Sequence, residues 1–276
     1  MNLGINPTHF YKAAIWEENR TLEEILELVR LAGFRHLNIN AATQADAEKI
    51  AEYTAQHGMV VTQSHMPFNR YDKKDPEVFM NTVMTYAQNA KTMGAGILVV
   101  HADEFDYAHR PYTSREALEY NYQTFYNLVD FAASNGMRVA FENTFQESGM
   151  VTQPHFCSLV DDLLALVDRF SADAVGVCWD TGHAKMQYKK QDMAALKEVI
   201  DRVICTHIHD NYYEKDLHCF PCMGTVQWTE FMEILRDAKY DGDFSFELVY
   251  DRFPKALAPD YLKLLYRTGE YLINEL

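Results

Sequence analysis

Short β-branched runs alternate along this chain with longer stretches of helical periodicity, and this alternation limits the available folds more than any other feature. We predict strands at residues 3–6, 36–40, 59–65, 96–101, 138–143, 174–180, 203–211 and 244–249. Apolar residues at helical spacing follow each of them, at residues 22–32, 44–56, 114–134, 159–170, 193–200, 228–238 and 259–273, and a further helix opens at Asp75 and Pro76. Strands that alternate with helices form a parallel sheet. Eight such units close a (β/α)8 barrel, also called a TIM barrel.

The totals suit a single domain of enzyme size. The 276 residues, 48% of them apolar, contain no linker-like stretch, so we predict one domain over residues 1–276. A net charge of −15 opposes binding to a phosphate backbone, and we expect no nucleic-acid partner. No apolar run is long enough to span a membrane and no signal peptide is visible, so we expect a cytoplasmic protein. The chain could form a homo-oligomer, because homo-oligomers are common among soluble proteins. The sequence shows no recognisable interface, so the oligomeric state stays open.

Side chains that can bind metals stand at the C-terminal ends of the predicted strands. In a barrel of this type that end carries the active site. Imidazole nitrogens and carboxylate oxygens together are the ligand set of zinc, manganese or iron. The pattern therefore predicts a divalent metal site among His65, His101, Glu142, Asp180, His207, His209 and Glu247.

Alternation along the strands indicates that the acids point into the barrel. Side chains two positions apart share one face of a strand. The intervening positions hold bulky apolar residues, whereas the positions two residues before each acid hold small ones: Ala140, Cys178 and Ser245. Buried carboxylates are costly unless a cation neutralises them. We therefore predict Glu142, Asp180, His207 and Glu247 as the primary metal ligands.

Two further histidines accompany this set. His209 shares its strand face with His207, so one of the two binds the metal and the other supports it; we favour His207 because His209 lies further out along the loop. His183 follows Asp180 after the turn-forming Gly182, and it either binds a second metal or hydrogen-bonds a substrate hydroxyl.

These segments resemble the xylose isomerase-like TIM-barrel superfamily. The resemblance rests on Glu142-Asn143, Asp180-Thr-Gly-His183, His207-Ile-His-Asp-Asn211, Asp216-Leu-His218 and Glu247, and it spans the whole chain. One departure is Pro221-Cys-Met-Gly224, where the superfamily usually has Pro-Gly-x-Gly, which puts the shape of that loop in question.

The resemblance to ketose 3-epimerases implies a metal-dependent sugar isomerase or epimerase. Glu142, Asp180, His207 and Glu247 would hold one divalent ion (manganese, cobalt, zinc or iron, with manganese and zinc favoured). Glu142 and Glu247 would also be the catalytic acid and base, passing protons to and from a metal-stabilised enediolate of a small sugar, sugar phosphate or polyol derivative. His183 would contact a substrate oxygen.

Two other activities remain open at this stage. The same enolate chemistry ending in loss of a β-substituent would make the protein a lyase or dehydratase acting on a keto-sugar or glycoside. The endonuclease IV type is similar at His65, His101, His183, Asp216 and His218, where such residues help to bind three zinc ions. A multi-zinc centre would suit phosphodiester hydrolysis of the apurinic endonuclease kind.

The predicted pocket rim is rich in aromatic residues. Rings of this kind pack against the C–H faces of sugars, which agrees with a small carbohydrate partner. The rim residues that we predict to contact the substrate are Trp16, Phe68, Phe145 and Arg252.

Overall fold

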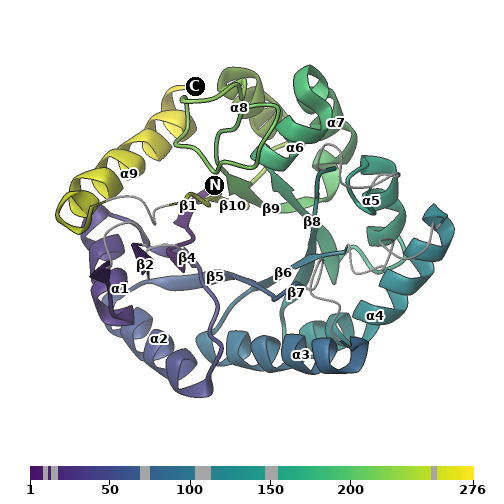
Figure 1. Ribbon diagram of the computed structural model, residues 1–276, viewed down its shortest axis with the longest axis horizontal. Coiled ribbons are helices and arrows are strands. Elements are labelled where there is room, and N and C mark those ends of the chain that lie inside the picture. The colour runs from purple at the N-terminus through teal and green to yellow at the C-terminus, as the bar shows by residue number, and fades with distance from the viewer. Residues whose placement is uncertain (9–11, 14–17, 69–74, 103–112, 147–154, 250–253) are drawn as a thin grey trace.

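The fold is a closed barrel of parallel strands surrounded by helices (Figure 1). The computed structural model describes residues 1–8, 12–13, 18–68, 75–102, 113–146, 155–249 and 254–276. Within these residues the barrel strands follow one another in the order β1, β10, β9, β8, β7, β6, β5, β4 and back to β1. Their bounds are Asn2–Ile5 (β1), His36–Asn38 (β4), Val60–His65 (β5), Ile97–His101 (β6), Arg138–Glu142 (β7), Val175–Asp180 (β8), Val203–Ile208 (β9) and Asp243–Phe246 (β10). The predicted (β/α)8 barrel is confirmed.

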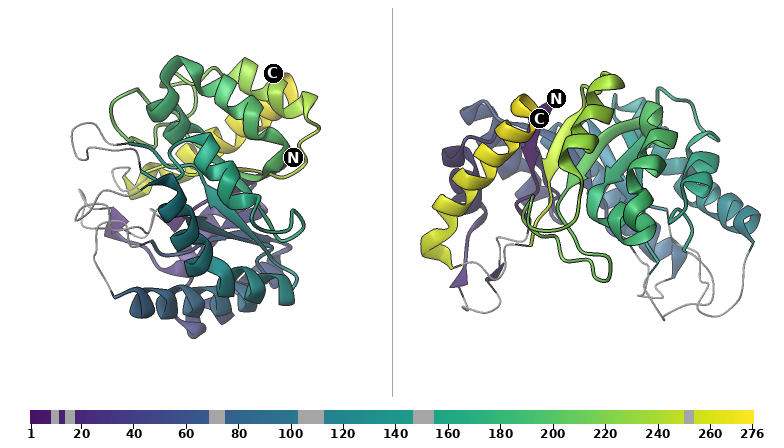
Figure 2. Two further views of the ribbon diagram at one scale, coloured as in Figure 1. Left: turned by 90° about the vertical axis from the view of Figure 1, so that its right-hand side faces the viewer. Right: turned by 90° about the horizontal axis from the view of Figure 1, so that it is seen from above.

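Helices form a ring outside the strands. Their bounds are Leu22–Ala32 (α1), Gln44–His57 (α2), Pro76–Met93 (α3), Ser114–Ser134 (α4), Val160–Val167 (α5), Thr181–Tyr188 (α6), Asp192–Val199 (α7), Trp228–Asp237 (α8) and Ala258–Glu275 (α9). Figure 2 shows both chain termini at the end of the barrel opposite to the face seen in Figure 1. In the part of the chain that the structure describes, no helix is both long enough and apolar enough to cross a membrane.

Three elements differ from the sequence prediction. A short antiparallel pair, Lys12–Ala13 (β2) with Glu18–Asn19 (β3), stands apart from the barrel. The helix α6 begins directly after β8, where we had expected only a turn at Gly182. Its hydrophobic periodicity is weak because nearly all of its residues are buried, from Thr181 to Met186, so no polar face marks it in the sequence.

Local signals fix the helix ends as the sequence predicts. Thr21 caps α1 in a reciprocal capping box with Glu24, and Gly33 ends the helix in the left-handed conformation that glycine adopts without strain. Asp75 caps α3, and Pro76 occupies the first turn, where its missing N–H costs nothing.

The strands bury different side chains on their two faces. Inside the barrel, Val99, Ala140, Cys178 and Cys205 form a small cluster, separate from the main core between strands and helices. Bulky residues such as Phe141 and Trp179 belong to that outer core. The predicted alternation on β7 and β8 is therefore confirmed, and small residues inside the barrel leave room above them for the acids.

Strand register brings the polar ends to one level. Asp180 on β8 pairs with His207 on β9, and His207 pairs with Ser245 on β10. Glu142 ends β7 beside His101, the last residue of β6. Parallel strands all present their C-terminal ends on one side, so residues distant in the sequence meet on the face seen in Figure 1.

Candidate metal centre

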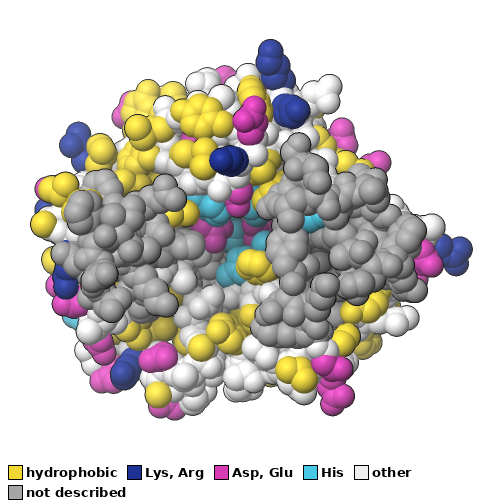
Figure 3. Space-filling model, in the orientation of Figure 1, with side chains coloured by type: hydrophobic (Ala, Val, Ile, Leu, Met, Phe, Trp, Pro, Cys, Tyr) yellow, Lys and Arg dark blue, Asp and Glu magenta, His cyan; other side chains and the backbone are white. Residues whose placement is uncertain are grey.

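Histidine and acidic side chains line the hollow at the middle of this barrel face (Figure 3). At its centre, His207 Nδ1 lies 3.1 Å from Glu142 Oε2 and 2.8 Å from Glu247 Oε2. Donor atoms of Glu142, Asp180, His207 and Glu247 all lie within 4.8 Å of one another. The structure thus brings together the four residues that we predict as primary ligands.

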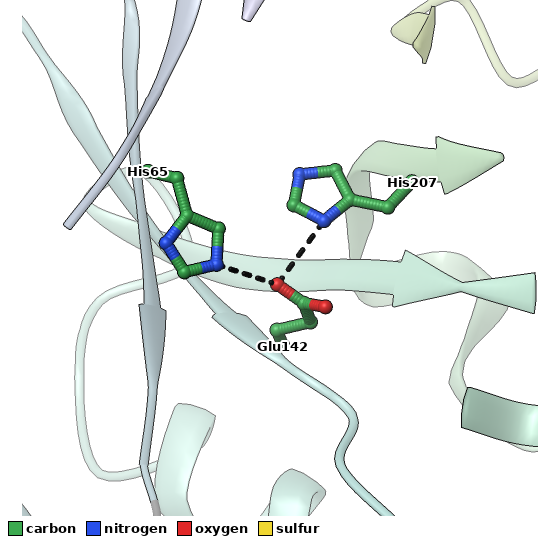
Figure 4. Close-up of side chains that lie close together, drawn as sticks. All are labelled: His65, Glu142 and His207. Atoms are coloured by element: carbon green, nitrogen blue, oxygen red, sulfur yellow. Dashed lines mark hydrogen bonds and ion pairs between the residues drawn. The ribbon is translucent and has the colours of Figure 1, made fainter. Parts of the chain in front are cut away.

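Glu142 is the shared member of the cluster and is 1% exposed. Its Oε2 lies 3.2 Å from His65 Nε2 and 3.4 Å from His101 Nε2, and Figure 4 shows Oε2 between His65 and His207. Its Oε1 lies 3.2 Å from His183 Nδ1. Burial acts to raise the pKa of this carboxyl, but the surrounding histidines hold the pKa well below its ordinary value. Glu142 is therefore a charged group in the interior, which requires compensating positive charge.

A further group of possible ligands lies beside the first. Donor atoms of His183, Asp216 and His218 also lie within 4.8 Å of one another. Asp216 Oδ2 is 3.5 Å from His183 Nε2 and 3.1 Å from His218 Nε2. His65, Glu142 and His207 form another such group. The described residues can therefore offer ligands to more than one ion.

The donor atoms fit a divalent cation. Ligand atoms about 2.0–2.2 Å from one ion stand about 3–3.6 Å apart, depending on the coordination geometry. His207 Nδ1 lies at a similar spacing, 3.1 and 2.8 Å from the oxygens of Glu142 and Glu247. Despite that spacing, this buried nitrogen forms no hydrogen bond with well-aligned geometry among the described residues. A histidine that binds metal through one nitrogen usually donates its other N–H to a carbonyl or carboxylate. His65, His183 and His218 follow that pattern, because their Nδ1 atoms lie 2.7, 2.9 and 2.8 Å from the carbonyl oxygens of Met66, Asn143 and Glu247.

The segment from Asp180 to His183 shows why the local sequence folds as it does. Asp180 caps α6 by accepting a hydrogen bond of 2.6 Å from the N–H of His183. The Thr181 hydroxyl bonds the backbone of His209 as donor and as acceptor. At Gly182 a Cβ would lie 1.8 Å from the His209 ring, so only glycine fits. The helix start thus fixes two predicted ligands, and aligned N–H groups at such a helix end favour a carboxylate.

His209 and Asp210 support the centre without joining the ligand groups. His209 Nε2 lies 3.0 Å from Asp180, so it donates to that carboxylate, in line with our preference for His207 as the ligand. The Asp210 carboxylate accepts hydrogen bonds from the Asn211 and Val226 N–H groups and from Trp228 Nε1. The bonds from Val226 and Trp228 close the loop that carries Asp216 and His218.

Comparison with known families agrees with this architecture. Residues 22–268 match the family described as xylose isomerase-like TIM barrel. The chain belongs to this family. An uncharacterized protein, y4fM, of Sinorhizobium fredii is 25% identical over 264 residues, which cover 83% of this chain and 81% of that protein.

Solved structures share the xylose isomerase-like fold at low sequence identity. A D-tagatose 3-epimerase-like protein has a TM-score of 0.78 at 18% identity, covering 100% of this chain and 99% of the other. The IOLI protein, described with a bound zinc atom, has a TM-score of 0.73 at 17% identity, covering 100% of this chain and 99% of the other. At these identities the likeness establishes the fold alone.

Two predicted rim residues of this xylose isomerase-like barrel lie against candidate ligand histidines. The Phe68 ring stacks on the His101 ring, with centroids 4.7 Å apart, and 51% of Phe68 is exposed. The Phe145 ring lies 4.9 Å from the His183 ring and is buried. Trp16 and Arg252, the other predicted rim residues, lie outside the described residues.

Sequence reasoning assigned no role to three asparagines that support the candidate ligands. Asn6 Nδ2 donates to Glu247 Oε1 over 3.0 Å, and Asn38 Nδ2 lies 3.0 Å from His207 Nε2. Asn143 Nδ2 donates to the carbonyl oxygen of Asp180. The rule that identified the ligands, polar residues at the ends of barrel strands, would also have found these three.

Proposed function

We propose that this protein is a divalent-metal-dependent isomerase or epimerase of a small sugar, sugar phosphate or polyol derivative. The observation that carries the proposal is the position of two carboxylates, Glu142 and Glu247, within 3.1 Å of the same nitrogen of His207. Glu142, Asp180, His207 and Glu247 would hold one ion between them. When bound there, a divalent cation would polarise a substrate carbonyl and its neighbouring hydroxyl as a Lewis acid.

The two glutamates are placed to move protons. Burial opposes their charge, but His207 lowers the pKa of both carboxyls, so each is ionised and able to accept a proton. One carboxylate would take the proton from the carbon beside the carbonyl, and the other, after taking up a proton from solvent, would return that proton to the opposite face of the same carbon or to its neighbour. Return to the same carbon gives an epimer, and return to the neighbour gives an isomer. Asn6 fixes Glu247 through Oε1, which leaves Oε2 for the centre.

The surroundings of the centre suit a sugar. The half-exposed ring of Phe68 offers an apolar surface beside His101, against which the C–H face of a sugar can pack. The polar side chains around the candidate ligands can form hydrogen bonds with the hydroxyl groups of a sugar. The similarity to a D-tagatose 3-epimerase-like fold supports the same substrate class.

Proton exchange tests this proposal directly. The protein, loaded with Mn²⁺ or Zn²⁺, would be incubated in D₂O with a panel of ketoses and ketose phosphates, and deuterium uptake at carbon would be followed by NMR. We expect Glu142→Gln and Glu247→Gln to lower exchange by 10²–10⁴-fold, the range of general acid–base contributions. Glu119→Gln is the matched control, because Glu119 pairs with Arg169 on the surface. Full activity in both site variants would refute the acid–base assignment.

A multi-zinc phosphodiesterase is the second candidate, and the His183–Asp216–His218 group favours it. Two or more ions can stabilise both the attacking and the leaving oxygen of a phosphoryl displacement. Metal analysis after zinc loading would give two or three ions per chain under this alternative. Cleavage of an abasic duplex that weakens steeply with salt would then displace the isomerase proposal. A rising enone absorbance with a ketose or glycoside would instead identify a lyase.

A further inference from the structure

His207 is oriented differently from three other candidate ligands, His65, His183 and His218. The rings of His65, His183 and His218 each direct Nδ1 to a backbone carbonyl oxygen. His207 instead directs Nδ1 to the carboxylates, and its Nε2 faces the side chain of Asn38. A backbone carbonyl can only accept a hydrogen bond, so it specifies which nitrogen carries the proton. For His207 that choice depends on a side chain.

Asn38 reaches His207 from the other side of the barrel. It ends β4, whereas His207 lies on β9, and both residues are 0% exposed. Asn38 Nδ2 lies 3.0 Å from His207 Nε2, and Asn38 Oδ1 has no hydrogen-bond partner among the described residues. Rotation of the amide by 180° exchanges its nitrogen and oxygen without other movement. Oδ1 would then face Nε2.

The orientation of the amide decides the state of Nδ1. If Nδ2 donates to Nε2, a neutral His207 must carry its proton on Nδ1, which then points at Glu142 and Glu247 and blocks a cation. If Oδ1 accepts from Nε2–H, the lone pair of Nδ1 faces the carboxylates. Only the second arrangement lets all four primary ligands bind one ion.

We propose that Asn38 is a positioning residue whose amide oxygen accepts the Nε2–H of His207 and thereby directs the Nδ1 lone pair into the metal centre. The proposal rests on the metal site of the proposed function but not on the reaction catalysed there. Hydrogen-bond partners of this kind contribute about 10–100-fold to metal affinity. Because of this dependence, a substitution at Asn38 can change which nitrogen of His207 carries the proton without removing any of the four candidate ligands.

The test measures zinc and manganese affinity by chelator competition, without substrate, in three variants. Asn38→Leu keeps the approximate shape and removes the hydrogen bond, and we expect affinity to fall about 10–100-fold. Asn38→Asp keeps an acceptor, and we expect affinity within about threefold of the native protein or tighter. Asn121→Leu is the control, because Asn121 is a buried asparagine in α4, where its amide bonds the Ala117 carbonyl oxygen. We expect that control to leave metal affinity unchanged.

A measurement on the native protein keeps the proposal testable if a variant does not fold. Long-range ¹H–¹⁵N correlation of the zinc-loaded protein should show His207 with a protonated Nε2 and a metal-bound Nδ1. A protonated Nδ1, or Asn38→Leu with native affinity, would overturn the proposal while the isomerase function stood. Absence of isomerase activity together with the expected affinities would overturn only that function. A native protein that binds no metal would overturn both.

Discussion

Replacing Gly182 by alanine should destabilise the protein although it lies in a helix. Alanine is favoured over glycine inside a helix by about 1 kcal/mol. Against this gain, the added Cβ would lie 1.8 Å from Cε1 and 2.4 Å from Nδ1 of the His209 ring. The ring would have to withdraw by about 1.7 Å to restore an ordinary contact of about 3.5 Å. His209 is 0% exposed, so the surrounding core must give way.

The withdrawal of the ring would also break its contact with Asp180. His209 Nε2 lies 3.0 Å from that buried carboxylate, and losing a partner of a buried charged group costs about 1–3 kcal/mol or more. Overpacking adds about 1–3 kcal/mol. After subtraction of the helix gain, we expect the free energy of unfolding of Gly182→Ala to fall by about 1–5 kcal/mol. Metal affinity should fall with it, because Asp180 is a predicted ligand.

Denaturant unfolding of the metal-free protein measures this loss. Gly96→Ala is the matched control, because a Cβ there would meet its nearest atom, the Thr62 carbonyl oxygen, at an ordinary 3.5 Å. The double variant Gly182→Ala with His209→Ala removes the clash and should recover part of the stability, although not the support of Asp180. An unfolding free energy of Gly182→Ala equal to or above that of the native protein would refute the reasoning.

Other predictions concern a buried ion pair, a loop anchor and the pH dependence of metal binding. Lys185 Nζ lies 2.6 Å from Asp192 and both are 1% exposed, so Lys185→Met should cost about 3–5 kcal/mol in urea unfolding, and Asp192→Leu in the same chain should recover much of it. If the single variant loses nothing, the charges are not paired in solution. Asp210→Ala removes the acceptor of three loop hydrogen bonds and should speed limited proteolysis between β9 and α8; an unchanged rate would contradict the anchoring role. Burial opposes protonation of His218, but Asp216 raises its pKa to about 9 in the metal-free chain, so an ion must displace a proton at neutral pH. After chelator removal of metal, zinc affinity of this group should rise with pH up to about 9, and calorimetry in several buffers should detect the released proton; a flat profile would argue against His218 as a ligand.

Much of the candidate site was accessible from the sequence because barrel geometry is regular. Strand ends converge on one face, so polar residues at those ends, such as Glu142 and His207, could be grouped before any coordinates were known. Alternation along β7 and β8 gave the inward direction of the acids. The helix α6 escaped prediction because it is buried on nearly all sides and so lacks an amphipathic pattern.

The sequence by itself determined the barrel, its approximate element bounds and the types of polar side chain at its C-terminal face. These depend on local periodicity, capping residues and side-chain type, all of which can be read from short stretches of the sequence. Only the tertiary structure decided which polar residues contact the centre of the site and which support their neighbours. That His209 supports Asp180 while His207 meets both glutamates follows from distances across β8, β9 and β10. The contact of Asn38 with His207 joins residues 169 positions apart, and no local pattern encodes an interaction that exists only because the sheet closes on itself.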